Sequence, residues 1–538
     1  MPIVPKSRLI HKIGTAGTVL FLLLVILYLI VSLLMIAEAY TNNSSSLAET
    51  LLNLFLWLIE ILMLPFAISL ILHVFAALSP RKDLPTILRT ELDAFPKLSI
   101  VLSTRNPNPL ALETNFLKAK RILYENVEIV VTDNSDNDAV PGIQELCARH
   151  HVKFFHRDGV VGFKARNLNR IFTNGTVTGK YALFIDIDQQ IIPESIEKLI
   201  KILEYYPRLA FVQAKYKIMN ATSTIRIIQA ILYSFYYNIL SLGKDAHETV
   251  LFNGTTACFR VAAILSVGGF PEETYCEDID ISVKLLLAGF KSRFLNQFVT
   301  EALVPWRLKD LLASMWRWVH GATSIGRLRT KEILGSNKIS LSVKIELILN
   351  NFIWLGGMGA ILFGICMAFL VLGNLNLLRP VLFLTMNGSG FNFSVGVVIP
   401  TAFAVISVIG SFLAIISDKQ FRFILFLPVY GIASVSLFFF LAPAILYGLL
   451  GMRGPKSGIW NRNIRIFHYI PLLISLAAIF FAASVNIMAV NALQGLFFLT
   501  LFTSTIGPLI FAFHERKRSF EEIETRYFLE IKSRLLSR

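Results

Sequence analysis

Long apolar runs are the feature that most limits what this chain can fold into. The sequence opens with two of them, at residues 17–37 and 51–78. A helix needs about 20 apolar residues to cross a hydrocarbon core, and each run is long enough. Only 16% of the 538 residues are charged, whereas 54% are hydrophobic, and soluble proteins have about 25% charged residues. We therefore expect an integral membrane protein with two transmembrane helices in residues 1–78.

The next segment, residues 79–343, has the composition of a soluble α/β domain. Short β-rich runs alternate there with helical stretches, which favours a mostly parallel sheet covered by helices. Ligands bind such sheets at the carboxyl ends of the strands. The expected strands are residues 98–103, 127–132, 152–155, 181–187 and 210–214.

Apolar runs resume in residues 344–538, which we interpret as a second membrane domain. Basic residues flank both ends of the run 421–450, and Pro428 and Pro443 interrupt it. Because Lys and Arg favour the cytoplasmic side, we interpret this run as re-entrant or interfacial. The same rule places the loop 452–466, both chain ends and the α/β domain in the cytoplasm. The other four runs, which we expect to span the membrane, are 345–372, 394–416, 470–490 and 493–513.

The net charge of +15 permits nucleic acid, anionic lipid or phosphorylated substrates as partners. The basic residues lie beside apolar runs, so lipid headgroups and phosphates are favoured and no nucleic-acid partner is expected. The cysteines lie far apart, without the spacing of a disulfide framework or a zinc site. They are Cys147, Cys258, Cys276 and Cys366.

Two acids, Asp186 and Asp188, follow an apolar strand. On an extended strand, residues two apart place their side chains on the same face. Hard oxygen ligands of this kind suit Mg²⁺ or Mn²⁺, which would hold a diphosphate and stabilise it as a leaving group. Taken alone, the motif also fits an ordinary polar loop.

Further polar residues are expected at the same edge of the sheet. Asp133 follows the strand 127–132, where a carboxylate can accept hydrogen bonds from a base or a ribose. A polar turn is the competing interpretation. Lys164 and Arg166 offer cations to a phosphate, and a solvated basic loop is the alternative there.

Transfer of a group to a hydroxyl needs a base that deprotonates this acceptor, and Asp278 is the candidate. Glu277 and Asp280 lie beside it and could instead cap the helix that follows. The segment 308–321 is predicted to be an amphipathic helix whose apolar stripe can lie in a membrane interface.

Arg317 and Trp318 lie off that stripe, together with Ser314. An arginine can bind a diphosphate, and an indole can stack on a sugar ring. An aromatic belt at the membrane interface is the alternative for the tryptophans of this helix.

In this order, the motifs resemble those of the processive family-2 glycosyltransferases, the group of cellulose, hyaluronan and chitin synthases. The similarity runs from about Leu98 to Gly321, and more weakly to Arg462. Lys164 matches the Lys-Ala-Gly-x-Leu-Asn segment, although Arg166 replaces its glycine. Further segments resemble the Asp-x-Asp, Phe-x-Gly-Thr, Thr-Glu-Asp and Gln-x-x-Arg-Trp motifs and the tryptophan-containing gating segment.

The resemblance assigns a role to each matching residue. The base is Asp278, next to Glu277, and the metal ligands are Asp186 and Asp188. The residues assigned to the nucleotide sugar are Asp133, Lys164, Asp186, Arg317, Trp460 and Arg462. The residues assigned to the acceptor are Phe252, Asn253, Gly254, Thr255 and Trp318. The chain departs from the motifs at Ser314, Cys276 and Asn461.

The resemblance implies a GT-A-type α/β nucleotide-sugar-binding domain inserted in a multi-span α-helical membrane domain. It also implies an inverting enzyme that uses Mg²⁺ or Mn²⁺. Such an enzyme polymerises sugar from a UDP- or GDP-sugar into a polysaccharide and translocates the product across the plasma (cell) membrane. The expected partners are the donor, the lipid bilayer, and a growing glycan or lipid-linked acceptor.

Two alternatives stay open. The first is a non-processive transferase that adds one sugar to a lipid phosphate or glycolipid. The second is a membrane transporter with a nucleotide-binding domain. Glu60 and His73 lie within an apolar run and would be the best evidence for the transporter, because ionisable groups within a membrane are often functional.

Overall fold

The computed structural model describes most of the α/β domain and part of the apolar helices. The described residues are 6–78, 83–157, 163–304, 308–359, 381–387, 390–396, 398–452 and 520–537, with single positions between 360 and 380. Trp460 and Arg462 lie outside this part, as do the expected spans 470–490 and 493–513 and the expected loop from residue 453 onward.

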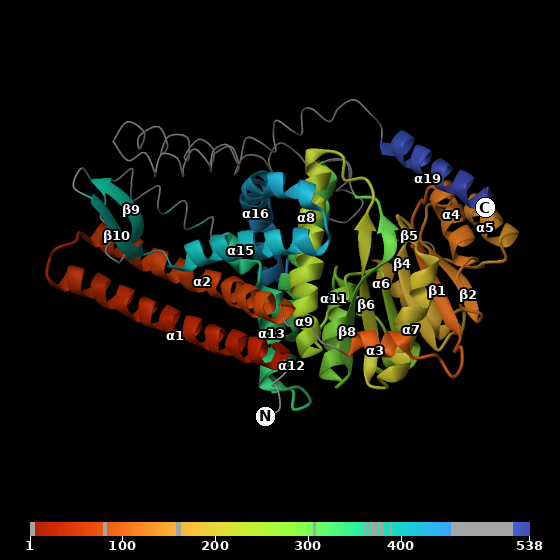
Figure 1. Ribbon diagram of the computed structural model, residues 1–538, viewed down its shortest axis with the longest axis horizontal. Helices are drawn as coiled ribbons and strands as arrows, with labels where there is room; N and C mark the ends of the chain where they lie inside the picture. The colour runs from red at the N-terminus through yellow and green to blue at the C-terminus, as the bar shows by residue number, and fades with distance from the viewer. Residues whose placement is uncertain are drawn as a thin grey trace.

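An eight-stranded mixed sheet forms the centre of the α/β domain (Figure 1), in the order β3-β2-β1-β4-β7-β6-β8-β5. Strands β1 to β4 pair in parallel, and so do β6 and β8. Strand β7 is antiparallel to both of its neighbours, β4 and β6, and the edge strand β5 is antiparallel to β8. The strands are β1 Leu98–Thr104, β2 Val127–Asp133, β3 Lys153–His156, β4 Tyr181–Asp186, β5 Gln189–Ile191, β6 Leu209–Ile218, β7 Ala257–Arg260 and β8 Lys291–Ala302. All five predicted strands are present. The prediction omits β5, β7 and β8. These strands belong to the half of the sheet that contains antiparallel pairs, so the sheet is mixed rather than mostly parallel.

Side chains alternate across the sheet and feed two separate cores. In β1, Ile100 and Leu102 join one core, whereas Val101 joins the other. The helices on the first core are α3 Leu84–Arg89, α4 Pro109–Ala119, α5 Val140–Arg149 and α7 Ile196–Tyr205, which follows the short η1 Pro193–Ser195. The helices on the second are α6 Phe163–Thr173, α10 Val261–Ser266, α11 Glu277–Leu287 and the π-helical η2 Tyr236–Ser241.

Two long apolar helices, α1 (Lys6–Thr41) and α2 (Leu47–Ala77), lie side by side and extend away from the sheet (Figure 1). Within the described part of the chain, Leu23–Thr41 and Leu47–Ala77 are long and apolar enough to cross a membrane. A reciprocal cap starts α2: Ser46 accepts a hydrogen bond from the Glu49 N–H, and the Glu49 carboxylate accepts one from the Ser46 N–H.

Most of the other described helices lie between these two helices and the sheet (Figure 1). They are α8 Thr224–Phe235, α9 Leu242–His247, α12 Leu308–Gly335, α13 Leu341–Phe352, α15 Val398–Ser417, η3 Phe421–Phe426 and α16 Leu427–Leu450. A hairpin of β9 (Val381–Asn387) and β10 (Gly390–Gly396) and a last helix, α19 (Phe520–Leu536), complete the described elements.

The two prolines do not end α16. Pro428 lies in the first turn of this helix, where proline is tolerated, and the helix continues through Pro443. The run 421–450 consists of η3 followed by α16. Its re-entrant or interfacial position stays a prediction.

The apolar stripe of α12 is present, but it packs against α16. Leu312, Met315 and Val319 share a buried cluster with Leu441 and Ala444. The two helices approach so closely that a side chain at Gly448 would collide with Thr323. Protein therefore covers the stripe that we expected in a membrane interface.

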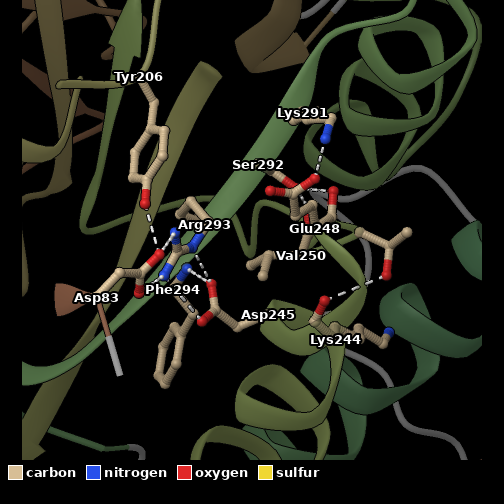
Figure 2. Close-up of polar contacts among 11 residues, drawn as sticks. Asp83, Tyr206, Lys244, Asp245, Glu248, Val250, Lys291, Ser292, Arg293 and Phe294 are labelled. Carbon is tan, nitrogen blue, oxygen red and sulfur yellow. Dashed lines mark hydrogen bonds and ion pairs between the residues drawn. The ribbon is translucent and has the colours of Figure 1, made fainter. Parts of the chain in front are cut away.

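A buried arginine joins three parts of the chain (Figure 2). Arg293 of β8 donates from Nε to Asp245 of α9 at 2.8 Å and from both terminal nitrogens to Asp83 at 3.1 Å. Asp83, which immediately precedes α3, also accepts a hydrogen bond of 2.5 Å from Tyr206. Two carboxylates thus compensate one guanidinium that water does not reach.

Replacing Arg293 with Met is expected to lower stability strongly, because Asp245 would be left buried without its cation. Breaking a buried ion pair in this way costs about 3–5 kcal/mol. The measurement is the thermal unfolding of the full chain in detergent. Arg149→Met is the matched control, because its bond to Glu145 is exposed and such pairs contribute little. Equal shifts in the two variants would contradict this account.

Candidate active site

Three parallel strands bring the predicted acids to one edge of the sheet. Thr104 at the end of β1 is in register with Asp133 of β2, and Ser103 of β1 is in register with Asp186 of β4. The carboxyl ends of these strands therefore lie next to one another, where α/β sheets bind their ligands. The sequence predicts this convergence correctly.

Asp133 is completely enclosed by protein. Its carboxylate accepts hydrogen bonds of 2.7 Å from Thr104 and 2.5 Å from Ser135, and His156 Nδ1 lies 2.7 Å from its second oxygen. The side chain of Asp133 is 0% exposed, whereas His156 is 17% exposed. In this conformation Asp133 therefore orients Ser135 and His156, and its contact with a nucleotide stays a prediction.

Lys164 and Asp186 form the ion pair at the centre of the site. The Lys164 ammonium, in the first turn of α6, donates to Asp186 at 2.6 Å and to the Gly254 carbonyl at 2.9 Å. Burial would lower the pKa of Lys164, but the nearby carboxylates, Asp186 foremost, outweigh it and raise the pKa. Lys164 is therefore positively charged at neutral pH.

The turn that carries Asp188 differs from the prediction. Strand β4 ends at Asp186, Ile187 and Asp188 form a turn, and β5 begins at Gln189. The alternation of side chains along one strand therefore does not place the two carboxylates together. Instead, the turn separates β4 from β5, which pairs with β8 on the far side of the sheet.

Gln189 is a site residue that the motifs do not identify. Its buried side-chain oxygen accepts hydrogen bonds from Thr255 at 3.0 Å and from Thr256 at 2.5 Å. Thr255 in turn accepts one from the Asp186 N–H at 3.0 Å. Gln189 thus fixes the loop 252–255 against the Asp186 turn, and its position directly after Asp188 is the only signal in the sequence.

The acceptor-side loop places its glycine against the candidate base. Phe252 is buried, and Asn253 donates to the Tyr237 hydroxyl at 2.6 Å. Gly254 has a φ of +89°, and a β-carbon added there would lie 2.9 Å from a carboxylate oxygen of Asp278. Both the backbone conformation and the contact therefore require glycine.

Glu277 and Asp278 begin α11 but do not cap it. The residue at the cap position is Cys276, and it makes no side-chain capping bond. Asp280 is fully buried and bound to Arg329, whose Nε donates to it at 2.8 Å. The capping alternative is therefore wrong for both Glu277 and Asp280.

The two carboxyls at the start of α11 have raised pKa values. Burial is the largest cause for Asp278 and the charge of Glu277 the next, and together they raise the pKa of Asp278 to about 7. Burial also raises the pKa of Glu277, although Lys164 opposes it. A carboxylate with a pKa near neutrality is well suited to accept a proton from a hydroxyl.

Arg317 and Trp318 project from α12 near these acids. Arg317 is exposed and close enough to Glu277 to lower the pKa of that carboxyl. Trp318 is half-buried and meets Tyr233 edge to face at 6.3 Å between ring centroids. The structure thus places Arg317 near Glu277 and Trp318 beside Tyr233.

The described residues contain no group of three or more His, Cys, Asp or Glu that could hold a metal ion by themselves. Asp186 and Asp188 nevertheless carry the oxygen ligands that a Mg²⁺ or Mn²⁺ site of another kind would use. Such ions are often held by one or two carboxylates together with the phosphates of a substrate. The side chain of Asp186 is 39% exposed, so a ligand can reach it.

The ionisable residues of α2 have partners inside the protein. The Tyr28 hydroxyl lies 3.2 Å from both carboxylate oxygens of Glu60, which joins α1 to α2. His73 Nε2 lies 3.3 Å from Glu346, which joins α2 to α13. Contacts between helices therefore account for the two residues that would have favoured a transporter.

The family comparison defines the class of protein to which this fold and this site belong. The family model described as "Glycosyl transferase family group 2" matches residues 181–502, more than half of the chain. The chain belongs to this family and is a glycosyltransferase. The predicted family, enzyme class and GT-A-like α/β domain are therefore confirmed.

The relatives are enzymes of polysaccharide synthesis. "Probable glucomannan 4-beta-mannosyltransferase 9" of Oryza sativa subsp. japonica is 28% identical over 232 residues, or 42% of this chain and 44% of the relative. "Glucomannan 4-beta-mannosyltransferase 2" of Arabidopsis thaliana is 26% identical over 237 residues, again 42% and 44%. The match thus spans about half the length of these curated relatives.

Among solved structures, the chain is similar to a mannosyltransferase from Pyrobaculum calidifontis in complex with GDP-Man and Mn2+. The sequence identity is 16%, the TM-score is 0.39, and the alignment covers 70% of this chain and 99% of that chain. A second similar structure is S. aureus TarS 1-349 in complex with UDP-GlcNAc, with 16% identity, a TM-score of 0.36 and coverage of 67% and 93%.

Replacing Gly254 with Ala is expected to abolish most sugar transfer, because the new methyl group would displace Asp278 and strain the loop. Release of nucleoside diphosphate is the measurement. Gly142→Ala is the control, because a β-carbon at Gly142 in α5 meets nothing within 4 Å. Wild-type rates in Gly254→Ala would show that the contact with Asp278 has no role in transfer.

Proposed function

We propose that the chain transfers a hexose, with inversion, from a nucleoside-diphosphate sugar to a glycan at the plasma (cell) membrane, and polymerises it. The observation that carries the proposal is the arrangement around Gly254. Lys164 bonds to its carbonyl from the Asp186 side, and Asp278 lies against its α-carbon. Gly254 therefore lies between Lys164, the proposed ligand of the diphosphate, and Asp278, the proposed base.

The base role of Asp278 follows from its environment. Its Oδ1 accepts a hydrogen bond from the Ile279 N–H at 2.8 Å, and a β-carbon at Gly254 would touch its Oδ2. In the deprotonated form, Asp278 would take the proton of the acceptor hydroxyl as that oxygen attacks the anomeric carbon. Attack from the face opposite the diphosphate inverts the configuration.

The cations of the site would hold the departing diphosphate. Lys164 and Arg317 are the candidates among the described residues, and Trp460 and Arg462 stay predicted contributors. Asp186 and Asp188 would hold Mg²⁺ or Mn²⁺, which supplies Lewis-acid stabilisation of the leaving diphosphate when it is bound. Trp318 would stack on the terminal sugar of the acceptor, with Asn253 and Thr255 nearby.

The named relatives guide the choice of donor. They are mannosyltransferases of glucomannan synthesis, so GDP-mannose is the first donor to test, followed by GDP-glucose and UDP-sugars. The apolar helices α1 and α2 support a membrane location, and the site is proposed to face the cytoplasm. Movement of the product through this membrane part belongs to the same proposal.

The decisive experiment is a donor screen with the full chain in nanodiscs. Release of nucleoside diphosphate is measured for each donor with and without Mn²⁺, and the glycan product is sized. Metal-dependent release with a long polymer supports the proposal. Products with a single added sugar on lipid would instead establish the non-processive alternative. Absence of release with every donor would overturn transfer from nucleotide sugars.

Asp278→Asn keeps the shape of the side chain but removes the base. The rate of transfer is expected to fall by about 10²–10⁴-fold, the usual contribution of a general base. Donor binding, measured by calorimetry with GDP or UDP, should change little, because Asp278 acts at the acceptor end. A variant that retains wild-type transfer would exclude Asp278 as the base.

The pH dependence of transfer should report the raised pKa of Asp278. Because the base acts when deprotonated, kcat/KM should rise with pH and level off above about 7. In Glu277→Gln, one like charge is removed, so the pKa of Asp278 falls and the rise should move to lower pH. Unchanged midpoints in this variant would contradict the assignment.

A further inference from the structure

The last described helix, α19, lies far from the site in sequence but against the site's sheet in space. It packs beside α4, at the end of the domain opposite the apolar helices (Figure 1). Phe528 is 0% exposed and forms a buried cluster with Ala111 of α4 and with Leu303, which follows β8.

Polar bonds hold the helix in register on α4. The Lys532 ammonium donates to Glu113 at 2.6 Å, and the Arg121 guanidinium donates to the Leu535 carbonyl. The next residue, Leu529, is 51% exposed and therefore lies on the other face of the helix. One face of α19 is therefore docked on the domain, and the other faces solvent.

The docked face reaches the turn between the two candidate metal ligands. Ile187, between Asp186 and Asp188, packs into the same cluster as Phe528. Asn115 of α4 donates to the backbone carbonyls of Ile187 at 3.4 Å and Gln189 at 2.8 Å. The Leu303 N–H donates to the Asp188 carbonyl at 3.5 Å.

This turn depends on neighbours because it lies outside the strands. Residues 187 and 188 form a turn that connects β4 to β5, so side-chain burial and the bonds from Asn115 and Leu303 hold it in place of strand pairing. Two carboxylates that share one ion must be held within about 0.5 Å of their working positions. The elements that hold them, α4 and residue 303, are the ones that α19 covers.

We propose that α19 is a positioning element of the active site, which holds the Asp186–Asp188 turn in the conformation that binds a divalent ion together with a nucleoside diphosphate. Phe528 is its key residue and acts through Ile187 and Leu303. The inference rests on the proposed function, because it assumes that the turn holds a metal–diphosphate complex. The family model matches residues 181–502, so α19 lies outside the matched region, and the inference gives this helix an influence on donor binding.

The test compares Phe528→Ala with Leu529→Ala in the full chain. Binding of GDP in the presence of Mn²⁺ is measured by calorimetry, without turnover. Phe528→Ala is expected to weaken it at least fivefold and to raise the donor KM by a similar factor, with kcat at saturating donor nearly unchanged. Leu529→Ala should behave like the wild type, because its side chain is largely exposed.

Hydrogen exchange gives a readout that does not need the ligand. Peptides that cover β4, the turn and β5 should exchange faster in Phe528→Ala than in Leu529→Ala, whereas peptides of β2 should not change. If Phe528→Ala lowers the unfolding temperature of the whole chain, the milder Phe528→Leu is used, and the same selective changes are expected.

The outcomes separate this inference from the proposed function. Wild-type GDP affinity and wild-type exchange in Phe528→Ala, with an active wild-type enzyme, would overturn the role of α19 and leave the function standing. Faster exchange at the turn without weaker binding would also overturn it, because the turn would then be loosened without consequence for the donor. Failure of the wild type to bind any nucleotide with Mn²⁺ would count against the proposed function itself.

Discussion

The ion pair between Lys164 and Asp186 is the interaction on which the arrangement of the site depends. Lys164 bonds at once to the end of β4 and to the carbonyl of Gly254. It therefore brings together a helix, a strand end and a loop from separate parts of the sequence. Gly254 in turn lies against Asp278, so the position of the base is set through the same contact.

Buried polar pairs also join the sheet to the apolar helices. Lys215 of β6 bonds to Asp418, next to α15, at 2.6 Å, and both side chains are nearly inaccessible to water. Arg293 joins β8, α9 and the segment before α3 through two further buried bonds. Because a buried charge is costly without its partner, these pairs permit few relative positions of the two parts. Buried charge thus contributes to the specificity of this contact, together with hydrogen bonds of Ser234 and Asn238.

The sequence predicts the elements that are periodic and the residues that lie at strand ends. The strands of the parallel half are found because they form buried apolar runs, and Asp133 and Asp186 converge because parallel strands end together. The turn at Ile187 is not predicted. Two turn residues between two strands do not change the alternation of side chains along the sequence. The roles of Gln189 and Phe528 escape it because each depends on partners far away in sequence.

The charge balance of the site explains why its base keeps a proton more readily than an ordinary aspartate. Asp186, Asp188, Glu277 and Asp278 bring four carboxyls, and among the described residues of the site Lys164 and Arg317 bring two cations. Lys164 bonds directly to Asp186, so less of its charge is free to stabilise the pair on α11. Burial and the repulsion of Glu277 then dominate at Asp278 and raise its pKa to about 7. The position of Lys164 beside Asp186 and the raised pKa of Asp278 are therefore two consequences of the same arrangement of charges.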